Sequence, residues 1–195
     1  MGTKVILKNV RIAFAQGLFE AKAPTDGNGK AAYSATFLFA PGSQEEKDIK
    51  AAMSAEAKAR WGEKAPTVYK QLVAAGRICL RNGDSKADYE GFEGNMFVAA
   101  RSTTKKPTVY GPDKSVIDRD NDNAPYSGCY VRASVEIYTI DKPGEIGKRI
   151  CCGLTAVQKI KDGDSFGGAA KADPNDFEET DISDTGISEE AEGLL

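Results

Sequence analysis

Hydrophobic and polar residues alternate at the start of the chain. Apolar side chains recur at every second position, with polar or charged residues between them, at Val5, Leu7, Val10, Ile12 and Phe14. This period predicts a strand with one buried face, and the longer step from Leu7 to Val10 predicts an irregularity near Asn9. A turn is expected from Pro24 to Gly29, and the aromatic-rich segment Ala31–Ala40 predicts a second strand.

The pattern then changes to a helical one. Ser43 followed three residues later by Glu46 is a capping box, and it predicts a helix that begins after Ser43 and ends at Gly62. A second, shorter helix is expected over Pro66–Ala75, with proline in its first turn and a glycine directly after it. Both predicted helices lie between strands, so they form an insertion in a β-rich chain.

Strands are expected again after the helices, at Arg77–Arg81, Gly94–Ser102, Cys129–Ile140 and Arg149–Lys159. The pair Asn82-Gly83 is a strong turn signal and opens a polar loop that reaches Gly94. Gly153 interrupts the last strand and predicts a bulge or a bend there. In the strand Cys129–Ile140 the predicted buried face is Val131, Ala133, Val135 and Ile137.

The order of these elements predicts the fold class. About five to seven strands with a helix inserted after the second or third strand favour a β-rich α+β fold. An OB-fold-like five-stranded antiparallel barrel with an inserted helix fits this order. We expect this domain to span residues 1–168. Residues 169–195 lack strand alternation and scatter a few apolar residues among acids, so they are expected to be a disordered acidic C-terminal tail.

Charge is segregated along the chain. Residues 1–171 hold all 26 Lys and Arg against 20 of the 29 acids, so this part carries a net charge of +6. Residues 172–195 carry nine acids and no base: Asp173, Asp176, Glu178, Glu179, Asp181, Asp184, Glu189, Glu190 and Glu192. Such asymmetry is typical of a body that binds a polyanion and a tail that interacts with partners. The tail is expected to compete with the polyanion for the body.

Several classes of chemistry are excluded or disfavoured. The chain has no histidine, which removes Ser-His-Asp and Cys-His catalysis. Its four cysteines form no C-x-x-C pair, so we expect small buried residues and no metal site. Asp118, Asp120 and Asp122 alternate as in a calcium loop, but the required Gly and Glu are replaced by Asn123 and Cys129. No phosphate-binding loop motif occurs. The sequence therefore predicts no cofactor and no enzymatic activity.

Cations and aromatic rings are interleaved in the second half of the body. Phosphates of single-stranded nucleic acid are neutralised by Lys and Arg, and unpaired bases stack on rings for about 1–3 kcal/mol each. The stacking candidates are Tyr89, Phe92, Tyr110, Tyr130 and Tyr138. The phosphate-binding candidates are Arg77, Arg81, Lys86, Arg101, Lys105, Lys106 and Arg132. A body of only +6 disfavours tight duplex binding, so unpaired bases are the expected ligand.

Five segments resemble a family of bacteriophage single-stranded DNA-binding proteins: Leu7–Ala15, Tyr33–Phe39, Leu80–Ser102, Tyr126–Tyr138 and Gly153–Gly168. The resemblance implies an OB fold and single-stranded DNA as the ligand. The acidic tail is similar in kind to tails that recruit replication or recombination proteins and compete with DNA. The chain has no apolar run long enough to span a bilayer and no signal-peptide pattern. Together with these absences, the resemblance implies a location in the cytoplasm of the infected host and no membrane partner.

Two other interpretations stay open at this point. The barrel could serve as a protein-interaction module of the replisome or recombination machinery without direct DNA binding. Loop carboxylates could hold Mg²⁺ in a nuclease, with Asp84, Asp88, Asp162 and Asp164 as the candidates. The oligomeric state is not predicted by any pattern.

Overall fold

Each long stretch of alternation forms a strand in the computed structural model, which describes residues 2–23, 29–142 and 147–167. The strands are β1 (Thr3–Ala13), β2 (Tyr33–Phe39), β3 (Leu80–Asn82), β4 (Met96–Ser102), β5 (Thr108–Tyr110), β6 (Tyr130–Lys142) and β7 (Gly147–Lys161). The helices are α1 (Gln44–Trp61), α2 (Ala65–Ala74) and the short 3₁₀ helices η1 (Ala15–Leu18), η2 (Gly62–Lys64) and η3 (Gly83–Lys86). The predicted disordered tail lies outside the described residues.

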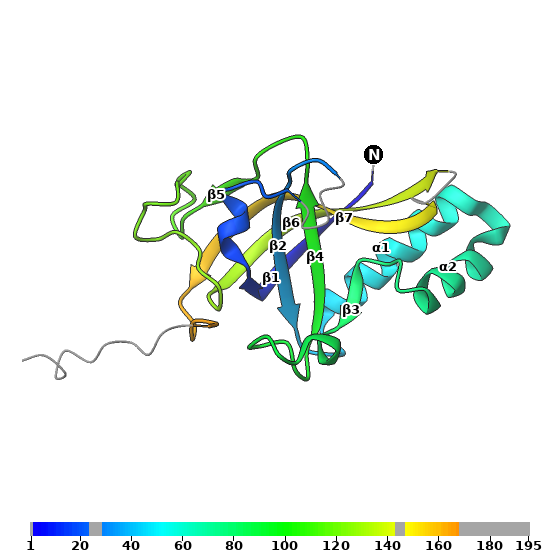
Figure 1. The fold of residues 1–195 in the computed structure, drawn as a ribbon, viewed down its shortest axis with the longest axis horizontal. Helices are drawn as coiled ribbons and strands as arrows, with labels where there is room; N and C mark the ends of the chain where they lie inside the picture. The colour runs from blue at the N-terminus through cyan, green and yellow to red at the C-terminus, as the bar shows by residue number, and fades with distance from the viewer. Residues whose placement is uncertain (1, 24–28, 143–146, 168–195) are drawn as a thin grey trace, which may run out of the picture.

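The strands form one sheet with the order β3-β4-β2-β1-β6-β7-β5. The sheet is strongly bent, so that β2 and β4 pass across β6 and β7 (Figure 1). One bridge, between Arg101 of β4 and Gly153 of β7, joins β4, β2, β1, β6 and β7 into a ring. The β4–β7 and β5–β7 pairings are parallel, so the prediction of a purely antiparallel barrel is wrong in that respect. The β-rich α+β class and the helices inserted after the second strand are confirmed.

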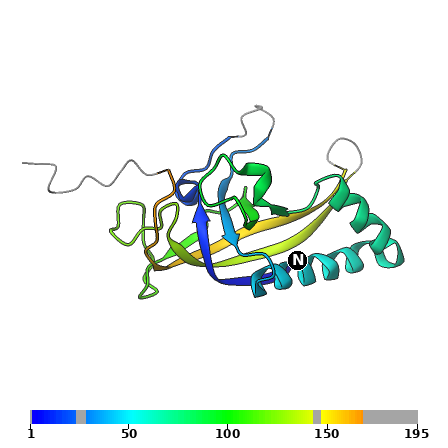
Figure 2. The same cartoon turned by 90° about the horizontal axis from the view of Figure 1, so that it is seen from below.

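The main core lies inside the bent sheet. The predicted buried face of β6 is confirmed, because Val131, Ala133, Val135 and Ile137 are all fully buried. Helix α1 packs on β1 and β6 and adds the fully buried Ile49 and Met53. Burying a side chain of this size stabilises the fold by about 1.5–3 kcal/mol. Figure 2 shows α1 on the opposite side of the sheet from the loop that follows η3.

The capping box of α1 is confirmed, except that the Glu46 side chain binds the backbone N–H of Gly42 rather than that of Ser43. The Ser43 hydroxyl accepts a hydrogen bond from the Glu46 backbone N–H at 3.3 Å, as predicted. The Glu46 carboxylate accepts from the backbone N–H of Gly42 at 2.6 Å and pairs with Lys50, and these two contacts lower its pKa. Because both ends of the box are satisfied, α1 begins where the sequence predicts.

A second, smaller cluster covers the outer face of the sheet. It contains Ala13, Leu38, Phe92 and Phe97, with Phe166 packed against its edge. Phe92 belongs to the loop between η3 and β4, and Phe97 belongs to β4. Their ring centroids lie 5.2 Å apart, so this contact holds the loop against the sheet. The loop is therefore an ordered cover over one end of β4.

Phe14 departs from the predicted strand. It was expected on the buried face with Ile12, but β1 ends at Ala13 and the Phe14 side chain is 44% exposed. Its backbone has φ 58° and ψ 40°, the left-handed conformation. For a non-glycine residue this conformation costs about 1–2 kcal/mol. Burying the ring would also have contributed about 1.5–3 kcal/mol.

The strand register tests two further expectations. The predicted irregularity near Asn9 is confirmed, because the β1–β6 pairing shifts between Leu7 and Val10. Gly153, however, is paired in register with β6, and the nearest shift lies between Leu154 and Ala156. The short strand β5 has no counterpart in the prediction. Three residues contain too little of a pattern to signal a strand, and their pairing with β7 is decided by tertiary contacts.

The end of the described chain is fastened to the end of β1 at a tight turn. Gly128 donates its backbone N–H to the Ile12 carbonyl at 2.7 Å, and its own carbonyl accepts from Arg11 Nε at 3.0 Å. The backbone N–H of Phe166 donates to the Ser127 carbonyl at 2.9 Å. At Gly128, where φ is 107°, a Cβ atom would overlap the Asp164 carbonyl oxygen. The close approach therefore requires glycine at this position.

We expect Gly128→Ala to destabilise the protein far more than Gly94→Ala. Both glycines have positive φ, but a Cβ at Gly94 would meet no atom within 4 Å. In the Gly94 variant, backbone strain alone should lower the free energy of unfolding, by about 1 kcal/mol. In the Gly128 variant the free energy of unfolding should fall by about 3 kcal/mol or more. Urea denaturation followed by circular dichroism measures both. Equal losses would contradict the close packing of residues 164–166 on Gly128.

Candidate nucleic-acid interface

The β4–β7 bridge brings together side chains that are distant in the sequence. Arg101 and Gly153 are bridge partners, and Gly153 lies opposite Glu136 in the β6–β7 ladder. On the same outer face, Tyr138 of β6 lies opposite Cys151 of β7. The exposed Arg101 guanidinium is close enough to act on the pKa of both Tyr138 and Cys151. A cation thus stands beside a ring on the outer surface of the sheet.

The ring of Tyr138 is half-buried and held in place. Burial is the main cause that raises the pKa of Tyr138, and a hydrogen bond with the Cys151 side chain contributes to the same shift. Burial also raises the pKa of the Cys151 thiol, while Arg149 and Arg101 act in the opposite direction. Arg149 therefore lies near Cys151 as well. A half-buried ring with a guanidinium group nearby is suited to stacking a base beside a phosphate.

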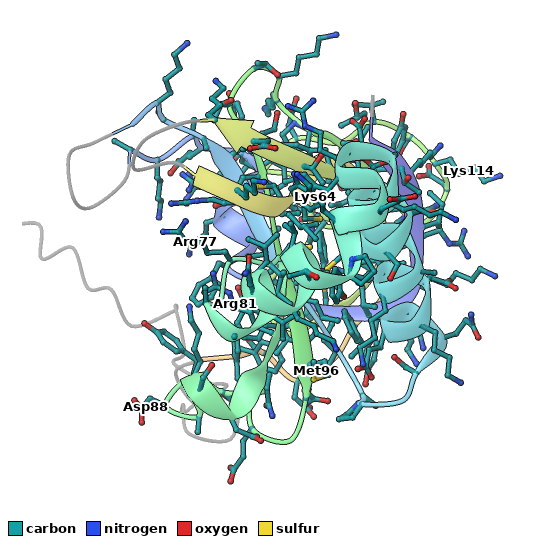
Figure 3. The ribbon with its side chains drawn as sticks, turned by 90° about the vertical axis from the view of Figure 1, so that its right-hand side faces the viewer. Lys64, Arg77, Arg81, Asp88, Met96 and Lys114 are labelled. Carbon is teal, nitrogen blue, oxygen red and sulfur yellow. The ribbon has the colours of Figure 1, made fainter. Side chains whose placement is uncertain are left out.

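More cations continue along β4 toward the loop that follows η3. Arg81 pairs with Phe97 in the β3–β4 register and donates to the Gly76 carbonyl at 3.2 Å. Lys86 Nζ lies 5.7 Å from the ring centroids of both Tyr89 and Phe97. Arg77 and Arg81 lie on the side of the molecule away from Lys114 (Figure 3). The Arg77 carbonyl accepts the Ile150 N–H at 3.1 Å, which places this residue beside β7.

We call this surface the β4 face. It consists of Arg77 and Arg81, which Figure 3 labels, and of Lys86, Tyr89, Arg101, Tyr138 and Arg149. Six of these seven residues were candidates from the sequence. Arg149 was missed, although the alternation of the strand Arg149–Lys159 places it on the outer face. Two acids near this surface are engaged by backbone N–H groups: Glu136 by Gly2 at 2.5 Å and Asp84 by Gly94 at 2.7 Å.

The other predicted residues lie elsewhere. Arg132 contacts Gln158 at 3.5 Å, next to the turn after β5, and Tyr110 belongs to β5 itself. Lys106 pairs with Asp118 at 3.8 Å, and the Lys105 carbonyl accepts a hydrogen bond in the same loop. The sequence set is therefore divided between the β4 face and the region around β5.

Tyr130 belongs to a third group at the other end of β6. Its ring has Arg11 at 5.6 Å and Lys161 at 4.4 Å from the centroid. Arg11 also lies 4.2 Å from the ring centroid of Phe166. Two rings and two cations thus alternate there, and Arg11 and Phe166 were not candidates from the sequence.

The prediction that Phe92 stacks on bases is wrong for this structure. Its side chain is 1% exposed, and it fills the small cluster under the loop. Apolar burial and base stacking require the same residue types, so the sequence did not separate them. The exposed rings next to it are Tyr89, 5.9 Å away, and Phe14, 6.1 Å away.

Three of the four cysteines belong to the core. Cys79, Cys129 and Cys152 are buried free thiols, and burial raises the pKa of Cys79 to about 12. Within residues 2–23, 29–142 and 147–167, no three Cys, Asp or Glu side chains gather as metal ligands would. In the same ranges, neither helix has the length and apolar character needed to cross a bilayer.

Solved structures of two phage proteins share this fold. The single-stranded DNA-binding protein from bacteriophage Enc34 in complex with ssDNA matches with a TM-score of 0.68 and 24% identity, over 84% of this chain and 89% of that one. A second structure of the same protein matches with a TM-score of 0.64 and 23% identity, over 89% of this chain and 88% of that one. For gp2.5, a single-stranded DNA-binding protein of bacteriophage T7, the values are 0.51 and 9%, over 91% and 100%.

Sequence comparison extends over almost the whole chain. Putative protein p50 of Acyrthosiphon pisum secondary endosymbiont phage 1 is 37% identical over 187 residues, which cover 93% of this chain and 96% of that protein. Residues 3–187 match the family described as "Enterobacter phage Enc34, ssDNA-binding protein". The chain therefore belongs to the Enc34 family of phage single-stranded DNA-binding proteins.

Proposed function

We propose that this protein binds single-stranded DNA on the β4 face without reading its sequence. The observation that carries the proposal is the bridge between Arg101 and Gly153, because the Tyr138 ring packs beside Gly153. A cation that can neutralise a phosphate then lies close to a half-buried ring, within a row of cations, and this supports the proposal. Family membership and the ssDNA-bound neighbour from bacteriophage Enc34 support the same ligand.

Charge and ring stacking are expected to contribute separately to the affinity. Lys and Arg neutralise phosphates and release counterions, which supplies affinity independent of sequence. With a net charge of only +6 over residues 1–171, charge alone gives limited affinity, so ring stacking must add to it. Stacking needs unpaired bases. The face therefore favours single strands over duplex, and the protein coats and protects such strands rather than cleaving them.

The five joined strands fit this role as an OB-type barrel. Strands β1, β2, β4, β7 and β6 follow each other around the ring, and the two helices stand between the second and third of them in chain order. We place this activity in phage DNA replication or recombination, in the cytoplasm of the infected host. A gel shift that compares single strand, duplex and RNA tests the ligand class. If none of them shifts, the chain is better explained as a protein-interaction module.

Arg101→Ala should weaken binding to oligo-dT about fivefold at low salt, because it removes one phosphate contact. The log–log slope of affinity against salt should become less steep by about 0.7, the value for one phosphate on a single strand. Arg132→Ala is the matched control, since it is another exposed strand arginine that lies outside the β4 face. Fluorescence anisotropy at several salt concentrations measures both. An equal loss in the control would show that binding is not confined to the β4 face.

Cys151 offers a chemical probe of the same face. Its thiol is half-buried, whereas Cys79, Cys129 and Cys152 are buried, so iodoacetamide should modify Cys151 first. Because burial raises the pKa of Cys151, and the thiolate is the reactive form, the rate should still be rising above the ordinary thiol pKa of 9.0. Bound oligo-dT should slow the modification, as measured by mass spectrometry, with Cys151→Ser as the blank. The same rate with and without DNA would place the strand elsewhere.

The acidic tail is proposed to compete with DNA for the β4 face and to recruit replication or recombination proteins. Its nine acids oppose a body of +6, and the interaction is screened over about 8–10 Å at physiological salt. Removal of residues 172–195 should therefore tighten oligo-dT binding, most strongly at low salt. A full-length variant with the nine acids changed to Asn or Gln should behave like the truncation. Equal affinities of all three proteins would leave partner recruitment as the only role of the tail.

A further inference from the structure

Phe14 is held on the surface by a strained backbone. Val10 and Ile12 point into the core, so a residue two positions further along a regular strand would do the same. The left-handed conformation of Phe14 instead turns its ring to the outside, where it is 44% exposed. In the described part of the chain, Lys114 is the one other non-glycine residue with positive φ. The strain and the incomplete burial of the ring both lower the folding stability, so stability alone does not explain the arrangement.

The turn itself does not require a phenylalanine. Phe14 is the N-cap residue of η1, yet its side chain makes no capping hydrogen bond. Its backbone carbonyl accepts from the Gly17 N–H at 3.1 Å, a contact that any residue could make. Glycine or asparagine would adopt the same conformation with less strain. Strain that the fold does not need points to a function of the side chain.

The surroundings turn the exposed ring into part of a platform. Phe14 meets Tyr89, which is 51% exposed, with ring centroids 5.5 Å apart and planes at 78°. In this edge-to-face contact, one ring keeps both of its faces away from the other. Phe92 lies 6.1 Å from Phe14 and 5.9 Å from Tyr89 and is buried against Phe97, so the exposed pair has a rigid support.

The charges around the pair include both signs. Lys86 lies over the Tyr89 ring at 5.7 Å. The loop also carries Asp84, Asp88, Glu90 and Glu93. Asp84 and Glu90 are engaged by the backbone N–H groups of Gly94 and Gly167, at 2.7 and 2.8 Å. A phosphate is repelled by these acids, so a strand at this place would present a base to the rings and keep its backbone toward Lys86.

We propose that Phe14 and Tyr89 form a stacking subsite for one unpaired base at the end of the β4 face. This rests on the proposed function and names the place where the strand leaves the sheet. Two exposed rings are much smaller than the area of a protein interface. Their area matches a single base, which stacks on any aromatic face irrespective of its identity. The subsite therefore adds affinity without adding sequence preference.

Phe14→Gly separates this role from a structural one. It relieves the backbone strain and removes the ring, so the melting temperature should stay within a few degrees of the wild type. The affinity for oligo-dT should nevertheless fall about tenfold. Lys114→Gly is the matched control: it relieves the same kind of strain on the side of the molecule away from Arg77 and Arg81 (Figure 3) and should leave the affinity unchanged.

A second variant reports stacking directly. Phe14→Trp in a Trp61→Phe background leaves one tryptophan, at the proposed subsite. It should bind oligo-dT like the wild type, and its emission should be quenched on binding. Tyr89→Ala should also weaken binding, and the double variant Phe14→Gly/Tyr89→Ala should lose less than the sum of the two losses, since both rings contact one base.

The outcomes distinguish the two proposals. If the wild type binds oligo-dT while Phe14→Gly binds equally well and Phe14→Trp shows no quenching, the subsite is overturned and the proposed function stands. The exposed rings would then serve contact with a protein. If the wild type fails to bind single-stranded DNA at all, both proposals are overturned together.

Discussion

Two long ladders of this sheet meet at a single place, the parallel bridge between Arg101 and Gly153. One ladder joins β2 to β4, and the other joins β6 to β7. A parallel contact of this kind cannot be made by a hairpin, because the two strands must be connected by a long excursion of the chain. The bridge brings Arg101 to Gly153, and the Tyr138 ring packs beside Gly153. Without the bridge, the outer face would hold separate cations and rings rather than a combined surface.

The sequence predicted the features that are determined by residues close together in the chain. The period-two burial of β6 and the capping of α1 at Ser43 were visible, because burial and capping are decided by residues a few positions apart. The β4–β7 contact was not visible, because no local pattern specifies which strand edges meet. Alternation could have placed Arg149 on the outer face, but its closeness to Cys151 and to the β4 face was not visible in the sequence.

The aromatic residues show a different limit. Phe92 and Phe14 are both apolar residues near predicted strand ends, yet one is 1% exposed and the other 44%. Hydrophobic period assigns a ring to a face only while the strand continues, and β1 stops one residue before Phe14. No glycine or asparagine marks the left-handed turn. The strain that makes Phe14 informative is therefore invisible in composition and can be recognised only from backbone angles.

The attachment of residues 164–167 to the folded body affects the proposed competition between the acidic segment and DNA. Phe166 is hydrogen-bonded to Ser127, and the Gly167 N–H donates to Glu90 in the loop beside the exposed rings. The acidic segment that starts at Asp173 is thus attached a few residues from one end of the β4 face. Any affinity of these acids for that face acts at an effective concentration set by the tether, on the order of millimolar for short linkers, rather than by the amount of protein. Dilution weakens binding between two molecules but not a contact within one chain, so under the proposed competition the outcome would depend on the supply of exposed single strand.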